Sequence, residues 1–399
     1  MGAAHRHAMN RRRFLKLSLK GAGAAALAGV APLLSGCAAT QGQRGEEESQ
    51  RKVIIVMFGG GTRSSEAIDD PRHRWIPRLW NDMAPRGTLF AHVAVQGAIV
   101  HPNCTASAWT GHVEWEDLDW TRPLKHPTVF EILRKHRGRP DTDAWAFVYA
   151  SILARAAESS DPAYGPAFAA NVVEPPTIPR ATAETMDQLL RRAAAGGSRQ
   201  AEIEAARQCA ELARRDSRLS RAGLRSAAAR DFVDRQFRAW QSSQGTTSHD
   251  AFLADCAIAA MKDFAPSVIA VAFGEIDCAH YGSWSRYVEA IARTDELTHR
   301  LWRAAEELSA YRGRTLMLIL PDHGRELERE GSTGFVHHSD FYTRRGEDEG
   351  CRRVWMLALG EGVPAGKRID RPVPNTSVAA TALGYVGLSA SAGTGTRCL

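Results

Sequence analysis

A chain of 399 residues is long enough for one large domain with an insertion, and its formal net charge is +6. The excess of positive charge lies in the first 36 residues, which contain six lysines and arginines and no acidic residue. Removing these six from the total of 51 leaves 45 basic residues, the same number as the 45 acidic ones. This balance argues against a basic surface for nucleic acid, so we expect no nucleic-acid partner.

The N-terminal segment has the order of parts found in a bacterial export signal. Residues 10–16 (NRRRFLK) resemble the twin-arginine motif, and the apolar stretch 21–34 is shorter than the ~20 residues that span a membrane. The stretch leads into Leu34-Ser35-Gly36-Cys37, which resembles a lipobox, whose cysteine is lipidated and becomes the new N-terminus. The sequence therefore predicts a signal peptide over 1–36, export by the twin-arginine route and a membrane anchor on Cys37, on the periplasmic or outer side.

The segment 37–52 is rich in Gly, Gln, Glu and Ser, and we expect a flexible tether there. Beyond it, short apolar runs recur at 53–58, 89–95, 145–149, 268–273, 316–320 and 354–359. Continuous apolar character is typical of strands that are covered on both faces, and helical patterns lie between the runs, most clearly at 285–311. This alternation predicts an α/β domain over 53–399, a three-layer sandwich around a mostly parallel sheet.

The stretch 181–263 differs in composition from the rest of the predicted domain. It is rich in Ala, Arg, Glu and Leu and lacks runs of β-branched residues, which favours two or three amphipathic helices. These helices either form an insertion over the C-terminal edge of the sheet or pack as ordinary helices of the main domain.

Acidic residues and histidines gather after two of the apolar runs. The candidates for metal ligands are Asp277, His280, Asp322, His323, His337 and His338. Because the carboxyl ends of parallel strands meet at one edge of a sheet, we expect these side chains to lie close together, with one of the last two histidines as a ligand. Carboxylates and imidazoles suit Zn²⁺, or Mn²⁺ with more oxygen ligands. The sequence therefore predicts a divalent metal centre of one or two ions.

The order of these residues resembles the alkaline phosphatase superfamily, which includes phosphatases, phosphodiesterases, sulfatases and cofactor-independent phosphoglycerate mutases. The most specific match is 316–324, where an apolar run precedes Asp322 and His323, as in the family's segment that binds one metal. Asp277 and His280 look like ligands of the other metal. The resemblance implies that two ions activate a nucleophile and stabilise the leaving oxygen of a phosphate ester, or of a sulfate ester.

The segment 101–112 is similar to the family's nucleophile segment, in which the attacking residue lies at a helix N-terminus. Thr105 is the first candidate for the nucleophile. Cys104 is the alternative, since sulfatases of the family use an oxidised cysteine, but their Cys-x-Pro-Ser-Arg signature does not continue here. Asn103 and Arg63 are candidates for substrate binding, and Arg63 either holds the phosphate bidentately or is a solvated loop arginine.

Two features depart from the family's pattern. The first strand of family members normally ends in a metal-binding aspartate, where this chain has Phe-Gly-Gly-Gly at 58–61. The step from Asp277 to His280 is three residues, whereas the family's usual step is four. The sequence therefore predicts an exported hydrolase of small-molecule phosphate or sulfate esters. Two alternatives stay open: a degenerate member that binds one metal or an anionic ligand without turnover, and a cell-envelope binding lipoprotein.

Overall fold

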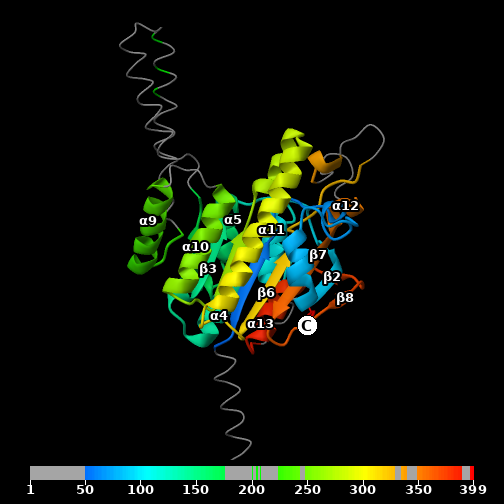
Figure 1. Ribbon diagram of the computed structural model, residues 1–399. Coiled ribbons are helices and arrows are strands. Elements are labelled where there is room, and N and C mark those ends of the chain that lie inside the picture. Colours follow the sequence, from blue (N-terminus) through cyan, green and yellow to red (C-terminus); the bar gives the residue numbers. More distant parts are fainter. Residues whose placement is uncertain are drawn as a thin grey trace, which may run out of the picture. The chain divides into compact units, whose positions relative to one another are not determined.

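The computed structural model of the chain describes residues 50–175, 200, 204, 207, 223–242, 248–328, 334–338, 348–388 and 396–399. The predicted signal peptide, Cys37 and the tether up to residue 49 lie outside the described residues, as does most of 181–222. Contacts divide the chain into the units Met1–Glu47 and Glu48–Leu399, and the second unit contains every described element (Figure 1). No described helix is long and apolar enough to cross a membrane.

One sheet of nine strands forms the middle layer, in the order β4-β3-β5-β1-β6-β7-β2-β8, with β9 paired to β2. The strands are β1 (Lys52–Met57), β2 (Gly87–Ala94), β3 (Ala144–Val148), β4 (Asn171–Val173), β5 (Val268–Ala272), β6 (Thr315–Leu320), β7 (Arg353–Gly360), β8 (Lys367–Ile369) and β9 (Val373–Pro374). The five strands from β4 to β6 run parallel, whereas β7 is antiparallel to both of its neighbours. The predicted α/β fold with a mostly parallel sheet is confirmed.

Helices lie on both faces of this sheet (Figure 1). The α-helices are α3 (His101–Thr110), α4 (Val129–Arg137), α5 (Ser151–Ala154), α6 (Gly165–Phe168), α9 (Ala227–Ser242), α10 (His249–Asp263), α11 (Trp284–Glu307), α12 (Glu349–Arg352) and α13 (Ser377–Tyr385). The short helical turns are η1 (Ser64–Glu66), η2 (Leu79–Met83), η3 (Ala84–Arg86), η4 (Asp141–Asp143), η5 (Arg155–Ala157), η6 (Glu275–Tyr281) and η7 (Gly334–Val336).

Strand β1 shows why the fold has a core on each side of the sheet. Successive side chains of a strand point to opposite faces. Ile54 and Val56 pack into the core that α9, α10 and α11 share, whereas Val53 and Ile55 pack into the core of α3, α4 and α13. All four side chains are at most 1% exposed. The continuous apolar run that predicted this strand thus reflects burial on both faces, which is the three-layer arrangement.

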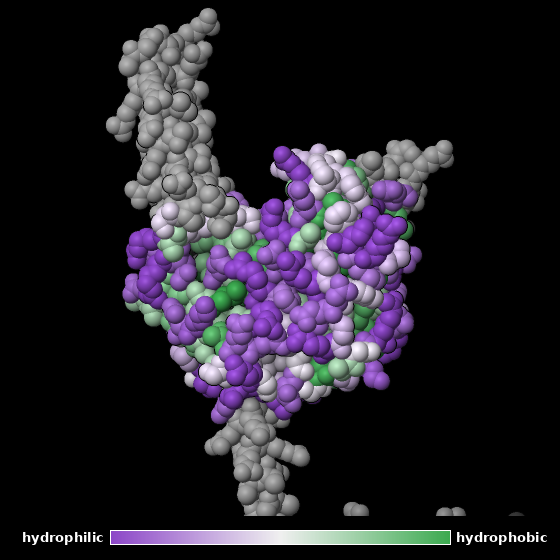
Figure 2. Space-filling model, in the orientation of Figure 1, coloured by the Kyte–Doolittle hydropathy of each residue, from purple (hydrophilic) through white to green (hydrophobic). Residues whose placement is uncertain are grey.

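Two helices of the range 181–263 belong to one of these cores. Phe232 of α9 and Leu253 of α10 are buried in the cluster that also contains Ile291 of α11. Helix α10 packs directly against α11 and β3. On the face drawn in Figure 2, hydrophilic residues predominate and hydrophobic ones are scattered among them, as expected when the apolar side chains fill the two cores.

Lys52, the first residue of β1, holds its ammonium group in a partly buried position. Its Nζ donates to the Ala265 carbonyl at 2.5 Å and lies over the ring of Tyr311. Burial lowers the pKa of Lys52 from 10.5 to about 8, against the opposing effect of Asp143. Between these two pH values the unfolded chain therefore binds more protons than the folded chain, and the contribution of Lys52 to the free energy of unfolding rises with pH.

We expect this titration to be visible in a comparison of the wild type with Lys52→Met. The free energy of unfolding of the wild type, relative to that of the variant, should increase as the pH rises from about 8 to 10.5, because methionine has no proton to lose. Urea denaturation at a series of pH values measures both. A difference that stays constant over this range would contradict the prediction.

Candidate metal centre

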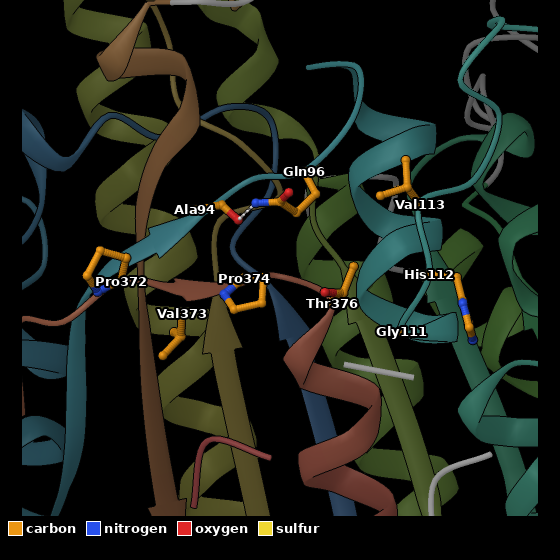
Figure 3. Close-up of a pocket in the computed structure, with 9 residues that line it drawn as sticks. All are labelled: Ala94, Gln96, Gly111, His112, Val113, Pro372, Val373, Pro374 and Thr376. Atoms are coloured by element: carbon orange, nitrogen blue, oxygen red, sulfur yellow. Dashed lines mark hydrogen bonds between the residues drawn. The ribbon is translucent and has the colours of Figure 1, made fainter. Parts of the chain in front are cut away.

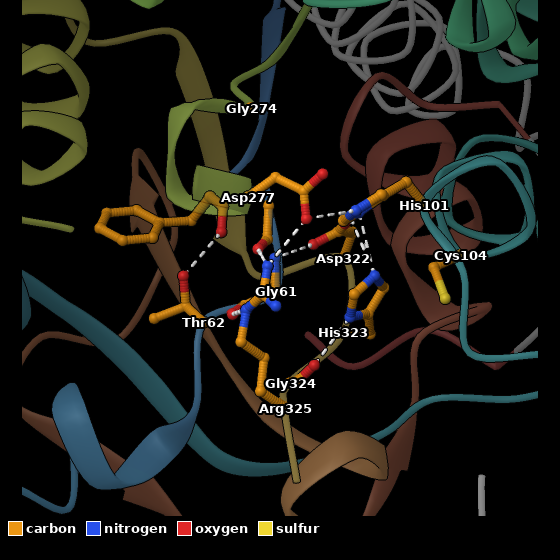
Figure 4. A network of polar contacts seen from close by, with 12 residues as sticks. Gly61, Thr62, His101, Cys104, Gly274, Asp277, Asp322, His323, Gly324 and Arg325 are labelled. Carbon is orange, nitrogen blue, oxygen red and sulfur yellow. Dashed lines mark hydrogen bonds and ion pairs between the residues drawn. The ribbon is translucent and has the colours of Figure 1, made fainter. Parts of the chain in front are cut away.

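The candidate site lies where the carboxyl ends of β1, β5 and β6 meet the start of α3. Strand β5 leads through Phe273 and Gly274 into η6, which contains Asp277 and His280, and Pro321 alone separates the end of β6 from Asp322 and His323. His101 is the first residue of α3. Because β5, β1 and β6 are neighbours in the sheet, their ends bring Asp277, Asp322 and His323 together beside His101 (Figure 4).

Three buried side chains place one potential ligand atom each at the corners of a triangle. His101 Nδ1 lies 2.5 Å from Asp322 Oδ2 and 3.0 Å from His323 Nε2, and the Oδ2 and Nε2 atoms are 3.7 Å apart. A tetrahedral Zn²⁺ with bonds of about 2.0–2.2 Å spaces its ligand atoms about 3.3 Å apart. The three separations lie on both sides of this value, and His101, Asp322 and His323 form the candidate metal centre.

An oxygen atom lies opposite the outer nitrogen of each imidazole. His323 Nδ1 lies 2.8 Å from the Gly324 carbonyl, to which it can donate, and its Nε2 lone pair then faces the triangle. His101 Nε2 faces Asp277 Oδ1 at 3.2 Å, within ion-pair distance, although the geometry is too poor for a hydrogen bond. A carbonyl or carboxylate behind the imidazole is the usual arrangement of metal-binding histidines, since it fixes the tautomer and orients the ring.

Burial and local charge set the protonation of the three side chains. Burial lowers the pKa of His323 to about 4, so its imidazole is neutral and ready to bind an ion. Burial alone would lower the pKa of His101, but the carboxylates of Asp322 and Asp277 outweigh it and raise this pKa to about 9. Burial alone would raise the pKa of Asp322, but the neighbouring imidazoles hold it well below its usual range. The two carboxylates thus favour a cation at this place.

Of the two late histidines, His338 lies in the cluster and His337 is exposed. The ring centroid of His338 lies 4.7 Å from those of His323 and His280 and 4.8 Å from that of His101. His338 Nδ1 is buried and has no hydrogen-bond partner among the residues that the structure describes. A buried nitrogen without a partner beside the triangle fits a further ligand of a bound ion.

Asp277 is the centre of a second set of contacts. Its Oδ1 atom lies 2.8 Å from Arg325 Nη2, 3.1 Å from His280 Nε2 and 3.2 Å from His101 Nε2. Burial alone would raise the pKa of Asp277, but the contacts with the two histidines and the charge of Arg325 hold it well below its usual range. Asp277 is therefore a carboxylate anion surrounded by donors.

Arg325 is a residue of the site that was not predicted from the sequence. Its side chain is fully buried, and its guanidinium donates to the carbonyls of Gly60 at 2.5 Å and Val336 at 3.3 Å. It also donates to the carbonyl of Gly61 at 2.8 Å and to Asp277 (Figure 4). Gly60 and Gly61 have φ angles of 90° and 77°, which glycine adopts without strain. The turn after β1 therefore presents two carbonyl groups to a buried cation.

Arg63 forms a buried ion pair with Glu66. Its Nε and Nη2 atoms donate to the two carboxylate oxygens at 2.6 and 2.8 Å, and its Nη1 donates to the Glu326 carbonyl at 2.8 Å. Burial alone would lower the pKa of Arg63, but the hydrogen bonds and the charge of Glu66 raise it. One of the two predictions for Arg63 was a solvated loop arginine. Its exposure is only 3%, so this prediction is wrong. A phosphate-binding role would require the guanidinium to leave Glu66.

The candidates for nucleophile lie behind His101 along α3. Thr105 follows His101 by four residues, so the two side chains share one face of the helix, one turn apart, and Thr105 is 1% exposed. Cys104 is fully buried, and burial raises the pKa of its thiol well above the usual range, so this cysteine stays protonated. The role of Thr105 stays a prediction.

Asn103, the predicted substrate-binding residue of the same helix, is engaged in structural contacts. Its amide nitrogen donates to the carbonyls of Glu114 and Trp115 at 3.0 and 2.7 Å, and its oxygen accepts from Trp120 Nε1 at 2.8 Å. These bonds tie α3 to the loop that follows it. The side chain is 1% exposed, so a contact with substrate would require these bonds to break.

A cavity of about 570 Å³ lies at the opposite end of α3 (Figure 3). It is lined by Ala94, Gln96, Gly111, His112, Val113, Pro372, Val373, Pro374 and Thr376. Helix α3 has 10 residues. With a rise of 1.5 Å per residue the helix is about 15 Å long, which separates this cavity from His101. None of the candidate metal ligands lines the cavity, so it is distinct from the metal centre.

No model of a protein family matches the chain, and no curated protein matches its sequence. Solved structures do resemble it. A protein in the alkaline phosphatase superfamily from Vibrio parahaemolyticus has a TM-score of 0.52 and 11% identity, over 87% of this chain and 69% of its own. The lipoteichoic acid synthase LtaP from Listeria monocytogenes has a TM-score of 0.51 and 10% identity, over 86% and 73% of the two chains.

The phosphonate monoester hydrolase SpPMH from Silicibacter pomeroyi has a TM-score of 0.50 and 14% identity, over 87% of this chain and 76% of its own. At such identities the likeness concerns the fold alone. The chain therefore has an alkaline-phosphatase-like α/β fold, as the sequence resemblance implied. Its cluster of candidate metal ligands lies at the sheet edge where open α/β folds bind their ligands.

Proposed function

We propose that the chain is a metal-dependent hydrolase of small-molecule phosphate or sulfate esters and a member of the alkaline phosphatase superfamily. The observation that carries this proposal is the triangle of His101, Asp322 and His323 at the carboxyl ends of the strands. Two structural neighbours, a phosphonate monoester hydrolase and a lipoteichoic acid synthase, support it by analogy of fold.

In this proposal the triangle holds a divalent ion, with His338 as a further ligand. Imidazole nitrogens and one carboxylate oxygen suit Zn²⁺, and Mn²⁺ is the second candidate. Such an ion supplies Lewis acidity to an ester oxygen. Asp277 faces the outer nitrogen of His101 and places a negative charge behind its ring.

The remaining positive charge around the site comes from the chain itself. Arg325 contributes a buried guanidinium. Helix α3 starts at His101 without a side-chain cap, so the positive end of its dipole lies beside the triangle. Both features favour an anionic substrate group such as a phosphate or a sulfate. Thr105 is the proposed nucleophile, which requires its hydroxyl to reach past His101.

A second candidate function is metal binding without turnover. It is favoured by the end of β1, which offers glycines where the family has a metal-binding aspartate, and by the engagement of Arg63 and Asn103 in structural contacts. In that case the fold and one ion site remain, but the substrate-binding groups do not.

An assay on metal-free and metal-loaded protein separates these functions. Protein treated with a chelator is tested on an aryl phosphate and an aryl sulfate, before and after addition of Zn²⁺ or Mn²⁺. If the chain is a hydrolase, it turns over one of the two esters only when metal is present. Thr105→Ala should then lose this activity, and Thr105→Ser should retain it. Bound metal without turnover supports the second candidate. Absence of bound metal would overturn both and leave a cell-envelope binding lipoprotein.

We also infer from the N-terminal sequence that the protein is exported by the twin-arginine route and anchored on the periplasmic or outer side through a lipid on Cys37. Such an anchor places the hydrolase at the membrane without a spanning helix. Mass spectrometry of the mature N-terminus tests this, since a lipidated Cys37 has the mass of its acyl chains in addition to that of the residue.

A further inference from the structure

Two groups of potential ligands meet in the cluster, and both include His101. One is the triangle with Asp322 and His323, and the other combines His101 with Asp277 and His338. A neutral imidazole has one acceptor nitrogen, because the other nitrogen carries a proton. His101 Nδ1 faces the triangle and Nε2 faces Asp277, so a neutral His101 can serve the triangle and cannot serve a second ion at the same time.

The place beside Asp277 is already taken by a cation. Arg325 Nη2 lies 2.8 Å from Asp277 Oδ1, and the other guanidinium bonds run to the carbonyls of Gly60, Gly61 and Val336. The side chain is fully buried, so these partners replace the water that an exposed guanidinium would have. An ion bound to Asp277 would lie against this guanidinium, with like charges in a buried environment.

The turn after β1 leaves no room for a further carboxylate beside Asp277. A Cβ atom at Gly61 would lie 2.9 Å from His323 Cε1 and 3.2 Å from Arg325 Nε, and a Cβ atom at Gly60 would lie 2.6 Å from the amide nitrogen of Asp277. The positive φ angles of both glycines add strain to any side chain there. The residues that fill this space are thus Arg325 and its partners.

We infer that Arg325 replaces the second metal ion of this site. The chain binds one divalent ion at His101, Asp322 and His323, and the guanidinium supplies the second positive charge next to Asp277. Asp277 accordingly acts as a positioning residue for His101 and as the counter-ion of Arg325 rather than as a metal ligand. The inference rests on the metal centre of the proposed function. It adds that the site binds one ion and that Arg325 prevents the binding of a second.

The test is a count of bound ions in folded, full-length protein. Chelator-treated protein is dialysed against Zn²⁺, and bound zinc is measured by elemental analysis and by native mass spectrometry. We expect one ion in the wild type and in Arg325→Lys, which keeps the charge. In Arg325→Met the carboxylate of Asp277 loses its counter-ion, so we expect a second, weaker ion held by Asp277 and His280. Arg368→Met removes an exposed arginine–aspartate pair on β8 and should leave one ion.

Two ions in the wild type would overturn the inference, and so would a single ion in a folded Arg325→Met. If this variant does not fold, the number of ions bound by the wild type still tests the inference. The outcome is also independent of catalysis: two ions with turnover would refute the role of Arg325 and leave the proposed hydrolase intact. One ion without turnover would support the role of Arg325 and refute the hydrolase.

Discussion

Asp322→Asn should abolish both Zn²⁺ binding and ester hydrolysis. Asparagine has the size of aspartate and its oxygen can still accept from the amide of Gly61, as Asp322 Oδ1 does at 3.3 Å. It cannot supply the charge that holds His101 and the ion. Loss of an outer partner of a ligand costs about 10–100-fold in metal affinity, so loss of a ligand should cost at least about 100-fold. Isothermal titration with Zn²⁺ and the aryl ester assay measure the two effects.

Asp70→Asn is the matched control for this variant. Asp70 is also a buried aspartate whose carboxylate accepts from backbone amides, those of Arg72 and Arg74, but it lies outside the cluster. We expect this variant to bind one ion with unchanged affinity. Circular dichroism of the chelator-treated proteins shows whether both variants are folded. Stoichiometric, tight Zn²⁺ binding by a folded Asp322→Asn would refute the assignment of the metal centre.

The sequence predicted the sheet well because its strands are buried on both faces. All six apolar runs are strands, and the predicted bounds differ by at most two residues from those observed. The short strands β4, β8 and β9 were not predicted. Two of the three residues of β8 are exposed, so that strand has no continuous apolar run to reveal it. The antiparallel direction of β7 was not predicted either, since burial on both faces says nothing of strand direction.

The site was predictable where a side chain lies within a few residues of a strand end. Asp277, Asp322 and His323 were found in this way, because strand order brings such positions together. His101 was not identified as a ligand because it starts a helix, and only the fold brings that helix to the sheet edge. Arg325 follows a metal-ligand motif and could equally have been a solvated arginine. Its burial against the turn after β1 depends on long-range packing.

The ion pair of Arg63 and Glu66 offers a test of what Arg63 does. The two side chains are 3% and 6% exposed, and the carboxylate also accepts from Tyr287 Oη at 3.0 Å and from Ser65 Oγ at 2.7 Å. These donors cannot neutralise the charge of Glu66. Removing one partner of a buried ion pair typically costs about 3–5 kcal/mol, because the other charge stays buried without its counter-ion.

We therefore expect Arg63→Met to lower the free energy of unfolding by about 3–5 kcal/mol, measured by urea denaturation. The double variant Arg63→Met/Glu66→Gln should lose less free energy of unfolding than the sum of the two single variants, since neither charge is then left alone. We expect this difference to be at least about 1 kcal/mol. If Arg63 instead holds the substrate phosphate, Arg63→Met would raise KM with little change in stability. The stability measurement on metal-free protein separates the two roles, because a phosphate contact contributes nothing to folding when no substrate is bound.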